Sequence, residues 1–135
     1  MIGVDTNVLL RMFVDDNHSQ AKIARALIEA SERQRDPILV TAVVFVEAEW
    51  SLRSNFGFTK TDIIGVFDDI LSDTGFQLDD RDAIDAALDA WRTGRADFAD
   101  YVIGALARER GARTTMTFDR GAAKDRGAFT LLADK

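Results

Sequence analysis

Several acidic residues of this chain stand where a parallel α/β fold places side chains that act on a ligand. Asp5 directly follows a short apolar run, and Asp119 follows a run of apolar and threonine residues. Asp97 and Asp100 are three residues apart, so they share one face of the helix that they open. Clustered carboxylates repel one another, and protonation or a divalent cation relieves that repulsion. Because all of these ligands are oxygens, they predict a site for Mg²⁺ or Mn²⁺.

Glu47 adds a carboxylate from a different helix. Its helical neighbours include Val43 and Trp50, so it projects from an apolar face, where a charge is costly unless it is paired or bound to a metal. Glu49 has Arg53 four residues later, the favourable order for a surface ion pair. We therefore assign Glu47 to the site and Glu49 to the solvated face.

Each acid also has an ordinary structural explanation. Asp5 is a good helix N-cap, Asp97 complements the dipole at a helix start, and Asp119 suits a turn. Asp100 lies one turn inside its helix and is harder to explain in that way. Together, the acids favour a metal that lowers the pKa of a bound water, orients it and stabilises charge on a phosphodiester.

The amino-acid composition excludes several other kinds of functional site. The 135 residues include no cysteine and one histidine, which excludes disulfide frameworks, thiolate zinc sites and histidine-rich metal sites. His18 precedes a helix, so we expect it at the surface. The net charge is −6, but residues 92–135 hold nine Lys and Arg against six Asp and Glu. No segment resembles a signal peptide or membrane span, and we expect a soluble, cytoplasmic protein.

The apolar pattern along the chain predicts short strands that alternate with helices, and these elements must position the acids. Such alternation predicts an α/β fold in which a parallel sheet is covered on both faces, in a single domain over residues 1–135. Ligands of such folds bind beyond the carboxyl ends of the strands. Strands are predicted at 1–4, 37–40, 76–78, 114–118 and 128–132. Helices are predicted at 8–13, 19–35, 41–56, 59–71 and 97–111, with an interruption at 15–17 after the first of them. A further helix is expected to be capped by Asp79 or Asp80 and to end near 91–94.

The motifs follow one another in an order that resembles PIN-domain ribonucleases, and more closely the VapC toxins of bacterial toxin–antitoxin pairs. The residues that carry the resemblance are VDTNVLLR at 4–11, Glu47 after a helix start at Thr41, DFAD at 97–100 followed by IGA at 103–105 and Ala107, and TFDR at 117–120. Each motif alone is weak, but the four in this order span almost the whole chain.

The resemblance implies a three-layer α/β/α domain with a central, mainly parallel five-stranded sheet. It also implies Mg²⁺- or Mn²⁺-dependent endoribonuclease cleavage of RNA by an activated water. Asp5 and Asp100 would be the primary metal ligands, Asp119 a water-mediated or second-metal ligand, and Glu47 the residue that orients the water. The implied site also contains Asp97 in or near the metal shell, and Asn7 and Thr117 in support of the acids.

The resemblance further implies a homodimer and a cognate antitoxin that inserts a tail near the acids. The helix around Glu47 carries more large apolar groups than one core face needs, which suggests a partner groove. The groove residues would be Phe45, Trp50, Phe56 and Phe58, and the candidates for holding RNA phosphates are Arg11, Arg92, Arg95, Arg120, Lys124 and Arg126.

Two other classes of function stay open on the residues alone. A metal-dependent phosphatase usually has a second acid two residues after the first, where this chain has Asn7. A phospho-acceptor domain needs a paired acid near the first strand and a late lysine, for which only Lys124 is available. The second class is a catalytically silent binding module that keeps the acidic pocket; losing Asp5 would abolish cleavage by a nuclease but leave such a module bound to its partner.

Overall fold

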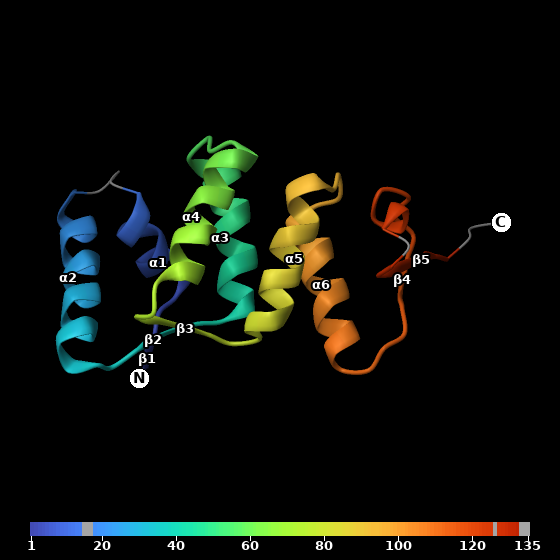
Figure 1. Cartoon of the computed structure of the whole chain (residues 1–135). Helices are drawn as coiled ribbons and strands as arrows, with labels where there is room; N and C mark the ends of the chain where they lie inside the picture. The colour runs from blue at the N-terminus through green and yellow to red at the C-terminus, as the bar shows by residue number, and fades with distance from the viewer. Residues whose placement is uncertain (15–17, 126, 133–135) are drawn as a thin grey trace. The chain divides into compact units, whose positions relative to one another are not determined.

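Short strands and helices alternate along the chain as the apolar pattern predicts (Figure 1). The computed structural model describes residues 1–14, 18–125 and 127–132, so the predicted interruption at 15–17 lies outside the described residues. The chain divides into two compact units, residues 1–79 and 80–135. The single domain expected over residues 1–135 stays a prediction. No described helix combines the length and the apolar character needed to cross a bilayer.

The first unit is built on a parallel sheet in the order β1-β2-β3. Its register pairs Ile2 with Ile38 and Ile38 with Phe76. Because the three strands run parallel, their carboxyl ends lie at one edge, where Asp5 follows β1. The elements of this unit are β1 (Ile2–Gly3), α1 (Thr6–Phe13), α2 (His18–Gln34), β2 (Ile38–Val40), α3 (Ala42–Asn55), α4 (Lys60–Ser72) and β3 (Phe76–Leu78).

An apolar core fixes α3 and α4 in the first unit. Phe45 and Phe67 are fully buried and meet edge to face with ring centroids 5.2 Å apart. Phe45 shares its buried helix face with Ala48 and Leu52, which follow at the spacing of an amphipathic helix. This packing leaves the opposite face of α3, with Glu47, outside the core.

The second unit consists of two packed helices and a parallel strand pair. Trp91 and Phe98 join the two helices with ring centroids 5.2 Å apart. Gly104 allows the chain before and within β5 to approach closely, because an added Cβ would lie 3.1 Å from side-chain atoms of Ala128 and Phe129. The elements of this unit are α5 (Arg81–Thr93), α6 (Phe98–Glu109), β4 (Thr115–Thr117), the 3₁₀ helix η1 (Ala122–Lys124) and β5 (Phe129–Leu131).

The predicted α/β class and the places of all five strands are confirmed. The expected single five-stranded sheet is not what the pairing shows, because the described strands form one sheet of three and one of two. Each strand has only two or three residues, so the alternation of apolar segments locates it without specifying its neighbour. The 3₁₀ helix η1 was not predicted.

Candidate functional site

Asp5 lies at the junction of β1 and α1, where it caps the helix. Its backbone is extended, and its Oδ1 accepts a hydrogen bond from the backbone N–H of Val8 at 3.0 Å. The capping explanation for Asp5 is therefore confirmed. The residue remains exposed, so capping holds a carboxylate at the carboxyl end of β1 without burying it.

Glu47 is joined to the same junction by a residue that the sequence analysis missed. The hydroxyl of Thr6 donates a hydrogen bond to Oε1 of Glu47 at 3.1 Å, which links the start of α1 to the middle of α3. A hydroxyl directly after Asp5 can donate to a second acid, but the sequence does not show which acid lies beside it. Thr6, which holds Glu47, is thus the residue next to Asp5 in the first unit.

The two glutamates of α3 have environments opposite to those predicted. Glu49 is only 4% exposed, so its assignment to the solvated face is wrong. Its predicted ion pair is confirmed, with Arg53 Nε 3.0 Å from Oε2. Glu47 is exposed, and its neighbours Val43 and Trp50 are 67% and 56% exposed. The face around Glu47 is therefore apolar in composition but open to solvent.

Asp100 lies in the first turn of α6, and Asp97 is the residue that caps that helix by position. Asp97 makes no side-chain capping bond, so capping does not occupy its carboxylate. The pKa of the Asp100 carboxyl is raised by partial burial, and further by the negative charges of Asp97 and Asp119. The second unit therefore brings Asp97 and Asp119 within electrostatic reach of Asp100.

Asp119 forms a tight turn after β4. Its Oδ1 accepts hydrogen bonds from the backbone N–H groups of Gly121 at 2.7 Å and Ala122 at 3.4 Å. Its own N–H donates to Oγ1 of Thr117 at 2.9 Å. The turn explanation for Asp119 is confirmed, and Thr117 holds the backbone of this acid.

These acids match the ligand chemistry of a divalent metal. Carboxylate oxygens are hard ligands of the kind that Mg²⁺ and Mn²⁺ prefer. The pKa of Asp100 is raised first by burial and then by the negative charges of Asp97 and Asp119, and a bound cation would offset those charges. Within the part of the chain that the structure describes, no three acids or histidines form a ready-made metal-binding group. The donor type fits a metal, whereas the ligand set stays a prediction.

Asn7 and Arg11 line a groove of about 390 Å³ beside Asp5, between α1 and α2. Arg11 is half-buried, and its Nε donates to Oε1 of Gln20 at 2.9 Å. Arg11 is thus held against α2. Asn7 is exposed next to Asp5, as a supporting residue would be.

The basic candidates of the second unit have different surroundings. Arg92 lies 3.6 Å from the carboxylate of Asp89, and Arg95 is exposed. Arg120 and Lys124 are exposed and line a common hollow. Arg126 lies outside the described residues.

The predicted partner groove loses one residue. Phe45 is fully buried against Phe67, so its place in an open groove is wrong. The reason is the helical period, which turns Phe45 to the core and leaves Trp50 on the open face. Phe56 and Phe58 are half-buried. His18 is exposed, as predicted.

Comparison with known proteins points to one family. The family model of the PIN domain matches residues 2–126, which covers the first unit from residue 2, the second unit up to residue 126 and all the acids described above. A comparison with curated proteins finds no match. PIN domains are generally metal-dependent nucleases that use divalent ions. On this match, and with acids at the motif positions, the chain belongs to the PIN domain family.

Proposed function

We propose that this protein is a Mg²⁺- or Mn²⁺-dependent endoribonuclease and acts as a VapC-type toxin of a bacterial toxin–antitoxin pair. The observation that carries the proposal is the grouping of Asp97, Asp100 and Asp119 in the second unit: the pKa of Asp100 is raised by partial burial and then by the charges of Asp97 and Asp119, which a divalent cation would offset. PIN family membership supports nuclease chemistry. RNA as the substrate rests on the resemblance of the motifs to VapC toxins.

Each acid has its own proposed role in hydrolysis of the phosphodiester. When bound, the metal lowers the pKa of a coordinated water and offsets charge on the scissile phosphodiester. Asp5 and Asp100 would hold the metal directly, Asp119 through water or at a second ion, and Asp97 in or near the same shell. Glu47 accepts a hydrogen bond from the attacking water and orients it.

Neighbouring residues keep these acids in position. Thr6 holds Glu47 through its hydroxyl, and Thr117 holds the backbone of Asp119. Asn7 supports Asp5 at the start of α1. The proposed toxin is a cytoplasmic homodimer that binds a cognate antitoxin, for which Trp50, Phe56 and Phe58 remain groove candidates. These partner assignments rest on the resemblance alone.

Cleavage of RNA tests the nuclease proposal. Purified protein is incubated with total bacterial RNA in Mg²⁺, Mn²⁺ or EDTA, beside Asp5→Asn and the control Glu29→Gln, an exposed acid of α2. We expect discrete fragments from the parent and the control, and none with EDTA or with Asp5→Asn. Absence of cleavage by folded, metal-supplied parent protein would overturn the proposal and favour a silent binding module.

Growth of a bacterial host tests the toxin role separately. Induced expression of the parent chain should arrest growth, and expression of Asp5→Asn to the same level should not. Cleavage in vitro without growth arrest would keep the nuclease and remove the toxin. Mapping the fragments by their ends would then name the RNA that is cut.

A further inference from the structure

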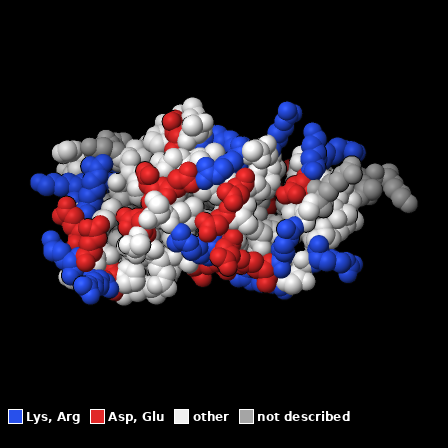
Figure 2. All heavy atoms as spheres, viewed as in Figure 1, with Lys and Arg blue, Asp and Glu red and all other residues white. Residues whose placement is uncertain are grey.

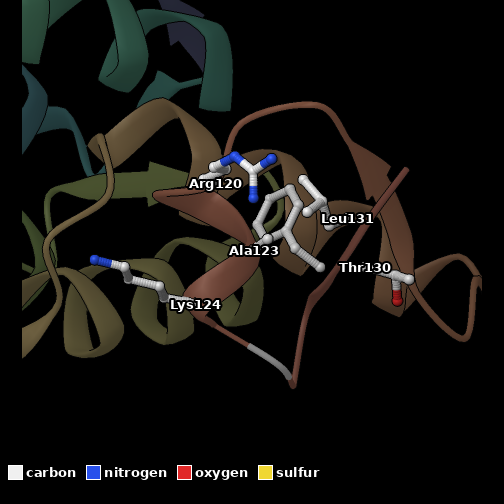
Figure 3. A pocket seen from close by; sticks show the side chains of 6 residues that line it. Arg120, Ala123, Lys124, Thr130 and Leu131 are labelled. Carbon is white, nitrogen blue, oxygen red and sulfur yellow. The ribbon is translucent and has the colours of Figure 1, made fainter. Parts of the chain in front are cut away.

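A hollow of about 580 Å³ opens in the second unit beside η1 and β5. Figure 3 shows the guanidinium of Arg120 close to Leu131, and Lys124 extending from η1 with its ammonium group directed away from them, while Thr130 and Leu131 come from β5. The hollow combines basic and apolar groups. Its lining residues are Arg120, Ala123, Lys124, Phe129, Thr130 and Leu131.

The charge of this hollow differs from that of the chain as a whole. The chain carries a net charge of −6, and Lys and Arg are interspersed with Asp and Glu over the face seen in Figure 2. The described lining of the hollow, by contrast, contains two cations and no acid. Neither Arg120 nor Lys124 forms an ion pair with a described acid, whereas Arg110 pairs with Asp80 at 3.7 Å. Two uncompensated cations at one hollow favour an anionic ligand.

The segment that carries both cations is held to a candidate catalytic acid. Oδ1 of Asp119 accepts from the N–H of Gly121, and its carbonyl oxygen accepts from the N–H of Ala123 at 3.0 Å. The N–H of Lys124 in turn donates to the carbonyl oxygen of Gly121 at 3.3 Å. These bonds fix the backbone of residues 119–124 as one turn, so the backbone positions from which Arg120 and Lys124 extend are set relative to Asp119.

The floor of the hollow is apolar. Phe129 is buried against Gly104, and Leu131 is half-buried. The hydroxyl of Thr130 lies 2.8 Å from that of Thr114, which already provides it with a partner. A bare inorganic anion would use the cations and leave this floor uncovered. A nucleotide has a phosphate for the cations and a sugar or base face for the floor.

We propose that this hollow binds the phosphate and sugar of a nucleotide next to the scissile bond of single-stranded RNA. The proposal rests on the ribonuclease function proposed above, because Asp119 would lie at the cut and the hollow adjoins the same turn. Single-stranded RNA is favoured over a duplex because its sugars and unstacked bases are free to contact an apolar surface.

Binding of labelled RNA tests the hollow independently of cleavage. The probe is a fluorescein-labelled single strand of about twelve nucleotides, followed by fluorescence anisotropy in EDTA from roughly 50 to 300 mM NaCl. The double variant Arg120→Gln/Lys124→Gln removes the cations of the hollow. The matched control Arg33→Gln/Arg113→Gln removes the same charge from exposed residues outside it. Circular dichroism and thermal melting check that each variant folds.

We expect the hollow variant to raise Kd about tenfold at the lowest salt. The slope of log K against log salt should fall in magnitude by about 1.4, as for two lost phosphate contacts on a single strand. The control should stay within about twofold of the parent. Equal Kd values for the hollow variant and the control would overturn the proposal, and so would an equal loss of affinity for duplex RNA of the same sequence.

Cleavage by the same proteins in Mg²⁺ separates this proposal from the proposed function. If the parent cleaves RNA and the hollow variant binds and cleaves like the control, the hollow is wrong and the ribonuclease stands. If the parent does not cleave but the hollow variant still loses affinity for the single strand, the RNA-binding surface stands and the ribonuclease is wrong.

Discussion

Thr6 donates its hydroxyl hydrogen to Oε1 of Glu47 across 3.1 Å, and so ties the first residue of α1 to the middle of α3. The preceding residue, Asp5, caps α1 through the N–H of Val8. One junction therefore sets the positions of two acids that are far apart in the sequence. This makes Thr6 a positioning residue for the proposed reaction.

Replacing Thr6 with Val keeps the side chain's shape but removes the donor to Glu47. A hydrogen bond to a charged group contributes about 1.5–3 kcal/mol, so we expect RNA cleavage to slow by roughly tenfold or more. Thr6→Ser restores the donor and should cleave within about twofold of the parent. Cleavage at the parental rate by Thr6→Val would show that this bond does not position Glu47.

Glu47 and Glu49 offer a matched pair of substitutions on one helix. Glu47→Gln should lower cleavage by at least about a hundredfold, with little change in stability, because the residue is exposed. Glu49→Gln should leave cleavage by the folded protein unchanged and cost about 1 kcal/mol of unfolding free energy, because it removes the negative charge and one acceptor oxygen from the buried partner of half-exposed Arg53. Cleavage rates and urea unfolding measure the two effects, and an equal loss of activity in both variants would refute the assignment.

Asp100→Asn should stabilise the metal-free protein while it abolishes cleavage. Burial, then Asp97 and Asp119, raise the pKa of Asp100 above its ordinary value of 3.8. The folded state therefore holds this proton to higher pH than the unfolded state, and stability falls as pH rises from 3.8 through the raised pKa. Above that range the ionised carboxylate disfavours the fold, and Asn removes this effect. Thermal melting in EDTA at neutral pH should show a higher Tm for the variant.

Added Mg²⁺ should reverse the order of these melting temperatures. A cation that binds only the folded state stabilises it more as the cation concentration rises above the Kd. Asp100→Asn removes a proposed ligand and should therefore raise that Kd. The parent should therefore gain more than the variant on titration with Mg²⁺. Asp85→Asn, which changes an exposed acid of α5, serves as the control and should follow the parent. Equal gains for all three proteins would contradict direct metal binding by Asp100.

Local signals predicted most of the element positions. Thr59 was expected to begin a helix, and its Oγ1 accepts from Asp62 N–H at 3.2 Å while Asp62 Oδ2 accepts from Thr59 N–H at 3.0 Å. Asp80 was likewise expected as a possible cap of the next helix, α5. It precedes that helix, but its backbone is left-handed with a φ of 56° and its side chain makes no capping bond. Caps are local, so they are read from sequence, but strand neighbours depend on distant packing. The partition into two sheets could not be predicted for that reason.

The sequence predicted which acids follow the strands, but it did not predict the burial or the hydrogen-bond partners of the site residues. Asp5 and Asp119 follow strands as expected, because acids directly after apolar runs are a local signal. The burial of Glu49 was missed because Arg53, at the next turn, satisfies its charge and removes the need for water. Thr6 was missed because its partner is 41 residues away. Long-range polar contacts of this kind leave no periodic pattern.

The turn before Asp97 depends on a glycine that has no room for a side chain. A Cβ at Gly94 would lie 1.8 Å from the hydroxyl oxygen of Tyr101 and 2.8 Å from the carbonyl oxygen of Ala90. Tyr101 is buried, and its hydroxyl accepts a hydrogen bond from Ala96 N–H at 3.3 Å. Any side chain at position 94 must therefore displace Tyr101 and break the bond that holds the loop.

Gly94→Ala should thus destabilise the protein by about 1–3 kcal/mol, as overpacking does. Gly65→Ala is the matched control, because Gly65 lies inside α4 with no atom within 4 Å of an added Cβ. There the smaller backbone entropy of alanine in the unfolded chain should raise stability by about 0.5–1 kcal/mol. Urea unfolding measures both changes. Because the loop leads into Asp97, the Gly94→Ala molecules that remain folded should also cleave RNA more slowly than the parent. Folded Gly65→Ala should cleave at the parental rate. A Gly94→Ala protein as stable as the parent would show that Tyr101 moves aside without cost and that this turn does not fix the start of α6.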